Sequence, residues 1–160
     1  MSEGGARGVR ATAARVLTTL VVIGLVLADA LALNQLTTQS SIDGIIQLTV
    51  VGAGMTGALG VLALVVGAGG RPWRWLAGPM AVIAVLALAG WRSDWPIGWA
   101  VVACAASAVV WAVAGARSVA ASHTDPTVSR TAATVMLVQA AIYASFALLA
   151  AVEGRHVLFG

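Results

Sequence analysis

Five apolar stretches constrain this chain more than any other feature of its sequence. They are residues 14–33, 45–66, 75–91, 97–116 and 131–152. Each is about 17 to 22 residues long, and a helix needs about 20 residues to cross the hydrocarbon core of a bilayer. Because no water reaches that core, the backbone must satisfy its own hydrogen bonds, which favours helices over open strands. The sequence therefore predicts an all-α protein, a single bundle of five transmembrane helices over residues 1–160.

The charge content agrees with a lipid environment. Hydrophobic residues make up 60% of the chain and charged residues only 9%, whereas soluble domains carry roughly 25% charged residues. The formal net charge is +3, but the basic residues are all arginines placed singly or in pairs at the ends of the apolar stretches. A nucleic-acid interface would cluster them on one exposed face. We therefore expect the partner to be the lipid bilayer and no nucleic acid.

The distribution of arginines predicts the orientation, because cytoplasmic loops of membrane proteins carry an excess of basic residues. With the N-terminus inside, the inner side holds Arg7, Arg10, Arg15, Arg71, Arg74, Arg117 and Arg130, and the outer side holds Arg92 and Arg155. The absence of lysine, beside abundant Ala, Gly, Val and Arg, is typical of GC-rich bacterial genomes. We expect a multi-pass protein of the bacterial cytoplasmic membrane, with the N-terminus in and the C-terminus out.

Two of the stretches allow a second interpretation. Arg7, Arg10 and Arg15 followed by residues 16–27 and Ala30-Leu31-Ala32 also resemble a signal peptide with its cleavage site. Cleavage there would leave four transmembrane helices. In the third stretch, Pro79 marks either a kink or the start of the helix.

Tryptophans mark the ends of several stretches. Indole rings favour the interface between lipid and water, where they anchor transmembrane helices. We expect this role for Trp73, Trp75, Trp91, Trp95 and Trp99.

A glycine pattern in the second stretch matches the GxGxxG dinucleotide fingerprint. It runs from Gly52 to Gly57, but the apolar stretch continues to Val66 and no acidic residue follows until Asp94. A dinucleotide site needs a strand, a turn, a helix and an acidic residue about 20 positions further on. Small residues spaced by four instead allow close packing of membrane helices. We expect helix packing and no nucleotide.

Asp29 is the most informative single residue, because a carboxylate in hydrocarbon is unfavourable by several kcal/mol unless it is paired, hydrated or neutralised. One interpretation is a proton-handling or ligand-binding acid. The other is an acid near the outer interface that hydrogen-bonds a neighbouring helix or water. Gln139 and Tyr143 lie one helical turn apart and share a face. They either line a small cavity with Asp29 or hold helices together.

Further polar residues are predicted in the outer half of the membrane or on the outer surface. Acids at such a mouth can serve acid–base chemistry or bind a cation or a basic partner, or they simply reflect the need for some polar residues. The catalytic candidates are Asp29, Asp43, Tyr143 and Glu153. The binding candidates are Gln47, Arg92, Asp94, Gln139 and Trp111.

Metal and cofactor sites are not expected. The two histidines, His123 and His156, are predicted on opposite sides of the membrane, so one metal or haem cannot use both. The single cysteine, Cys104, excludes an intramolecular disulfide and is expected to be a small packing residue.

No motif is specific enough to indicate a family, and three functions remain open. The first is a non-enzymatic subunit or accessory factor of a larger membrane complex, with Trp111 available for an intramembrane contact. The second is an acid–base isomerase, cyclase or hydrolase that acts on a lipid, an isoprenoid or another apolar small molecule. The third is a small transporter or channel component that uses Asp29 and Gln139. An enclosed cavity lined by Asp29, Gln139 and Tyr143 would favour the enzyme. A solid core with an apolar groove outside would favour the subunit.

Overall fold

The computed structural model describes residues 3–39, 42–65, 71–91, 96–126 and 128–159, and these ranges contain helices and the turn residues 122–126 and 128–129, with no strand. The five helices are α1 (Glu3–Gln39), α2 (Ile42–Val65), α3 (Arg71–Trp91), α4 (Pro96–Ala121) and α5 (Arg130–Phe159). The all-α class is thus confirmed. Several helices run beyond the apolar stretches, because hydropathy marks only the part that suits hydrocarbon, whereas the helix continues into the interface.

Four of the five helices are long and apolar enough to cross a membrane. These segments are Ala11–Leu31, Trp73–Gly90, Ile97–Ala121 and Arg130–Val152. Helix α2 has 24 residues, but its described apolar segment, Val51–Val61, is shorter than a span. The chain is therefore a helical protein with four candidate membrane spans among its described residues, and the fifth span stays a prediction.

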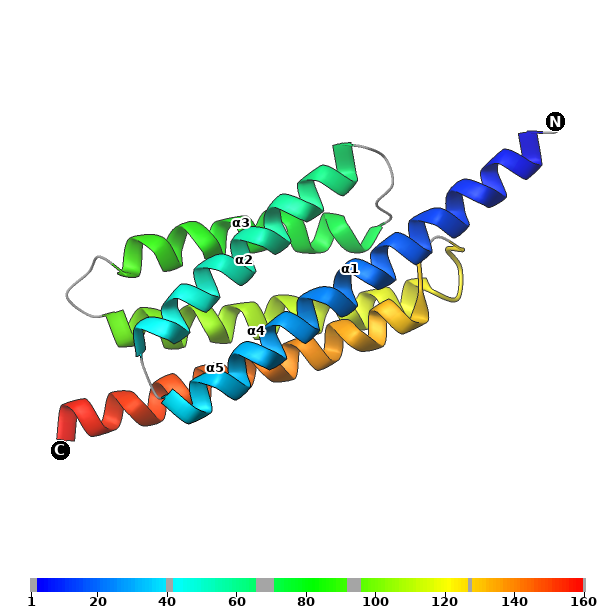
Figure 1. Cartoon of the computed structure of the whole chain (residues 1–160). Coiled ribbons are helices and arrows are strands. Elements are labelled where there is room, and N and C mark those ends of the chain that lie inside the picture. Colours follow the sequence, from blue (N-terminus) through cyan, green and yellow to red (C-terminus); the bar gives the residue numbers. More distant parts are fainter. Residues whose placement is uncertain (1–2, 40–41, 66–70, 92–95, 127, 160) are drawn as a thin grey trace.

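The helices form two antiparallel hairpins with α1 laid across them (Figure 1). The closest packing is within the hairpins α4–α5 and α2–α3, and α3 joins the two by packing against α4. Helix α1 packs mainly against α5, to which it runs parallel, and less extensively against α2. Helix α1 therefore has two contact lines, one with α5 and one with α2.

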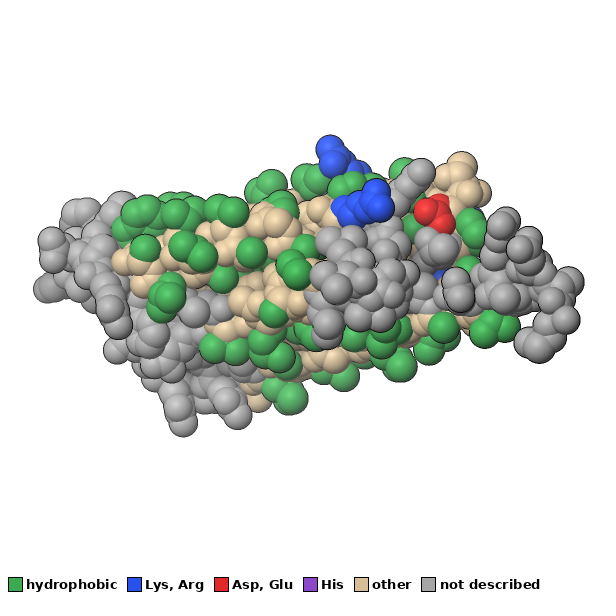
Figure 2. Space-filling view, turned by 90° about the horizontal axis from the view of Figure 1, so that it is seen from above, with side chains coloured by type: hydrophobic (Ala, Val, Ile, Leu, Met, Phe, Trp, Pro, Cys, Tyr) green, Lys and Arg blue, Asp and Glu red, His purple; other side chains and the backbone are tan. Residues whose placement is uncertain are grey.

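The outer surface of the bundle is apolar along its length. Large side chains such as Leu20, Val85, Val109 and Leu148 are exposed, and Figure 2 shows hydrophobic side chains along the flank with charged ones gathered toward one end. That end is where α1, α3 and α5 begin and α4 ends. It carries the four arginines whose side chains are described: Arg15, Arg74, Arg117 and Arg130. We call it the arginine-rich end.

The glycine motif lies wholly inside helix α2, where it permits close helix packing. A Cβ on Gly57 would lie 3.1 Å from the backbone nitrogen of Ala81 on α3. A Cβ on Gly60 would lie 2.8 Å from the Cβ of Ala77 and 3.2 Å from the Trp73 ring. Because the motif forms neither a strand nor a turn, it lacks the geometry of a dinucleotide site. The packing interpretation is confirmed for this segment.

The structure excludes one of the two interpretations of Pro79 and corrects the expectation for Trp73. Pro79 lies inside the helix, which begins at Arg71, so it does not mark the start. Pro72, at the second position of α3, is better suited to that role because the first helical turn needs no backbone N–H donor there. Trp73 is not an indole anchor facing lipid. It is buried, and its Nε1 donates a hydrogen bond to Thr18 Oγ1 on α1 at 3.3 Å.

Candidate functional site

The buried polar centre of the bundle joins α1 to α5. Asp29 on α1 is 4% exposed, and its carboxylate accepts a hydrogen bond from Nε2 of Gln139 on α5, which is fully buried. Hydrocarbon offers no water to either group, so each needs a partner within the protein. The bond satisfies Asp29, whereas Oε1 of Gln139 has no partner among the described atoms.

Tyr143 completes this centre from one turn further along α5. Its hydroxyl lies beside the Asp29 carboxylate, outside regular hydrogen-bond geometry. It also faces Gly52 on α2, since a Cβ at Gly52 would overlap the hydroxyl and would lie 3.4 Å from Asp29 Oδ1. The Tyr143 ring packs edge-on against Phe146, with centroids 5.8 Å apart. Three helices therefore meet at Asp29, Gln139, Tyr143 and Gly52, which we call the polar centre.

An open apolar groove runs along the seam between α1 and α2 and reaches the polar centre. Its volume is about 310 Å³. It is lined from α1 by Val21, Gly24, Leu25, Ala28 and Asp29, and from α2 by Val51, Gly52, Met55 and Leu59. Among the described lining residues, Asp29 is the one with a charged side chain. Gln139 and Tyr143 do not line it, because they lie behind Asp29 and Gly52. We call it the α1–α2 groove.

Other polar side chains also pair between helices. Thr49 on α2 contacts Cys104 on α4 at 3.1 Å between Oγ1 and Sγ, so Cys104 is a buried packing residue. Thr19 on α1 lies 2.9 Å from Ser129, which precedes α5. Such contacts are typical of the polar side chains that hold membrane helices together.

The structure brings together three of the predicted site residues, Asp29, Gln139 and Tyr143. Trp111 lies elsewhere, fully buried in the core on α4, and its Nε1 has no partner in the part of the chain that the structure describes. Arg92 and Asp94 lie outside the described residues. The side chains of Asp43, Gln47 and Glu153, and those of Arg155 and His156, are also outside the description, although their backbones belong to helices.

Sequence reasoning missed Gly52 as the residue that admits the Tyr143 hydroxyl. The GxGxxG spacing identified Gly52 as a packing residue, but only the fold shows that it faces α5 and not α3. It also missed the α1–α2 groove, because the groove depends on how loosely α1 packs against α2.

His123 lies in the turn after α4, where its Nδ1 is 3.0 Å from a guanidinium nitrogen of Arg130. No group of three or more His, Cys, Asp or Glu side chains gathers among the described residues.

The described helices, four of which are long and apolar enough to cross a membrane, are consistent with a small integral membrane protein. Comparisons with protein-family models, with curated proteins and with solved structures find no match to this chain.

Proposed function

We propose that this chain is a non-enzymatic subunit or accessory factor that docks a partner's transmembrane helix in the α1–α2 groove. We place it in the bacterial cytoplasmic membrane with five spans, the N-terminus inside and the first helix retained. Retention is supported by α1 itself, because Val22 and Leu25 belong to the hydrophobic core and Asp29 to the polar centre. The observation that carries the proposal is the groove itself, an apolar surface open at the flank of the bundle.

The lining of the groove suits a helix. Gly24, Ala28 and Gly52 are small, so a partner's backbone can approach closely, and close approach is what drives association in lipid. Val51 and Met55, on the α2 side, are more than half exposed and available for contact. The Asp29 carboxylate at the floor offers an acceptor to a hydroxyl, amide or cationic donor on the partner. An apolar helix with one such donor is therefore the occupant we infer.

A groove-filling variant tests this proposal. A Cβ added at Gly24 meets nothing within 4 Å, so Gly24→Leu fills the groove without disturbing the isolated bundle. The same holds for Gly78 on α3, outside the groove, which makes Gly78→Leu the matched control. With a photo-crosslinker at Met55 in the native host, we expect one discrete membrane-protein adduct that Gly24→Leu abolishes and Gly78→Leu keeps. An adduct with lipid alone, or one that Gly24→Leu leaves unchanged, contradicts the proposal.

A second function is favoured by one specific observation, the placement of Asp29 in the groove beside the Tyr143 hydroxyl. The Asp29 carboxyl group lines this apolar groove, and the Tyr143 hydroxyl lies next to that carboxyl group without lining the groove. A carboxyl group in such a place is suited to proton transfer on a lipid or isoprenoid substrate. Asp29→Asn in the native host separates the two functions. Loss of a lipid product at unchanged protein level supports the enzyme, and loss of complex assembly supports the subunit.

A further inference from the structure

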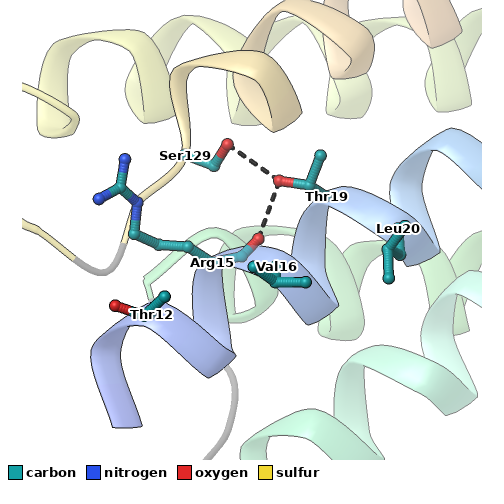
Figure 3. A pocket seen from close by; sticks show the side chains of 6 residues that line it. All are labelled: Thr12, Arg15, Val16, Thr19, Leu20 and Ser129. Atoms are coloured by element: carbon teal, nitrogen blue, oxygen red, sulfur yellow. Dashed lines mark hydrogen bonds between the residues drawn. The ribbon is translucent and has the colours of Figure 1, made fainter. Parts of the chain in front are cut away.

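A second cavity lies at the arginine-rich end, between α1 and the residues that lead into α5 (Figure 3). Its volume is about 270 Å³. It is lined by Thr12, Arg15, Val16, Thr19, Leu20 and Ser129. None of these residues belongs to the polar centre or to the α1–α2 groove, so the cavity needs an explanation of its own.

The polar wall of this cavity is held in place by hydrogen bonds. The Thr19 hydroxyl lies 2.8 Å from the carbonyl oxygen of Arg15 and 2.9 Å from Ser129 Oγ. Ser129 Oγ also accepts a hydrogen bond from the backbone nitrogen of Ala132 in the first turn of α5. These bonds connect α1 to the start of α5. The Thr12 hydroxyl donates to the carbonyl oxygen of Gly8 at 3.1 Å, so each hydroxyl group of the lining has a partner and Arg15 is the group that remains for a ligand.

Arg15 is exposed, and Figure 3 shows its side chain extending away from α1 beside Ser129. It forms no ion pair with any carboxylate in the described part of the chain. A guanidinium group carries five N–H donors and matches the oxygens of a phosphate. The cavity thus presents an unpaired cation where a hydrocarbon core meets the headgroup region.

The apolar wall continues from the cavity toward the middle of the membrane. Val16 and Leu20 are 53% and 63% exposed and lie one turn apart on α1. Leu27 and Leu31 continue the same exposed face. From Arg15 to Leu27 the helix rises about 18 Å, slightly more than the hydrocarbon depth of one leaflet. A cation followed by an apolar strip of this length is complementary to a phospholipid, whose phosphate is followed by an acyl chain.

We propose that this cavity binds an anionic phospholipid, with its phosphate on Arg15 and an acyl chain along Val16, Leu20 and Leu27. The surroundings favour an anion, because Arg74 near the start of α3 and Arg130 at the start of α5 lie at the same end of the bundle. Basic sites of this kind, between helices and at the membrane surface, recognise anionic headgroups. A lipid bound between α1 and the residues that lead into α5 would add to the Thr19–Ser129 contact and so stabilise the docking of α1. This inference does not depend on the proposed function.

The test compares two arginines of the full chain, purified in an uncharged detergent. Arg15 lines the cavity, whereas Arg117 is exposed at the same end on α4 and does not line it. We expect phosphatidylglycerol to raise the Tm of the wild type by about 3 to 5 °C, and phosphatidylcholine to raise it much less. Arg15→Gln abolishes the difference between the two lipids, and Arg117→Gln retains it. Native mass spectrometry is expected to show a retained phosphatidylglycerol molecule in the wild type and not in Arg15→Gln.

Three outcomes overturn the proposal. One is an unchanged response to phosphatidylglycerol in Arg15→Gln. Another is an equal loss in Arg117→Gln, which would indicate general attraction of anionic lipid to the arginine-rich end. The third is an equal rise in Tm with glycerol phosphate, which has no acyl chain and identifies the site as one for a soluble phosphate. Because the Arg15 side chain is exposed and unpaired, its replacement leaves the fold itself intact.

Discussion

Asp29 of α1 accepts a hydrogen bond from Gln139 of α5, and each of these residues lies ten positions after its counterpart in the contact between Thr19 and Ser129. Both pairs are separated by 110 positions in the sequence. Ten residues correspond to about 15 Å of helix. Two contacts at one offset, this far apart, show that α1 and α5 run parallel in a fixed register. The polar centre and the cavity beside Arg15 therefore lie at two levels of one interface between α1 and the α5 segment.

Replacement of Asp29 by an apolar residue is expected to destabilise the protein, because it leaves the buried side chain of Gln139 without its partner. Asp29→Leu leaves both polar atoms of the Gln139 amide unpaired in the core, and we expect the free energy of unfolding to fall by about 1 to 3 kcal/mol. Asp29→Asn keeps an acceptor for Gln139 and is expected to lose less than about 1 kcal/mol. Denaturant unfolding in mixed micelles measures these differences.

The double variant Asp29→Leu with Gln139→Leu provides the control for this coupling. Because both polar partners are gone, its loss of stability should be well below the sum of the two single losses. Strict additivity would show that the two side chains do not act as a pair.

Gly52→Ala is expected to destabilise the bundle by about 1 to 3 kcal/mol, because its methyl group overlaps the Tyr143 hydroxyl. Tyr143→Phe removes that oxygen, so it should restore most of the stability lost in Gly52→Ala. Gly24→Ala, where a Cβ meets nothing within 4 Å, is the matched control and should be neutral or stabilising by up to about 1 kcal/mol. If Tyr143→Phe gives no rescue, the hydroxyl does not occupy the space above Gly52.

The fold class was predictable because lipid imposes both the length and the backbone geometry of a spanning segment. The meeting of Asp29 with Gln139 and Tyr143 was predictable for a related reason, since buried polar groups in hydrocarbon turn inward and find partners. The choice of neighbours was not predictable. That α1 packs parallel to α5, and that Trp73 turns inward to Thr18, depends on side-chain packing between segments distant in sequence, which hydropathy does not encode.

The contact between α2 and α3 is expected to depend on Gly60. An Ala side chain there meets the Cβ of Ala77 and the ring of Trp73, so Gly60→Ala should lower the free energy of unfolding by about 1 to 3 kcal/mol. Adding Ala77→Gly removes the nearest overlapping atom and should restore part of this loss. Gly78→Ala, which faces open space on α3, controls for helix propensity. Equal stability of Gly60→Ala and Gly78→Ala would mean that α2 and α3 do not approach this closely.

Thiol labelling in intact cells tests the proposed orientation. The native Cys104 is fully buried, so it should not react with a membrane-impermeant maleimide and the wild type serves as the blank. His123 is exposed in the turn after α4, at the arginine-rich end, and Asn34 is exposed near the opposite end of α1. With the arginine-rich end in the cytoplasm, Asn34→Cys should be labelled in intact cells and His123→Cys only after permeabilisation. The reverse pattern would place the arginine-rich end, and with it the cavity beside Arg15, on the outer side of the membrane. Labelling of both residues in intact cells would show that α1 and α4 do not connect opposite faces of the membrane.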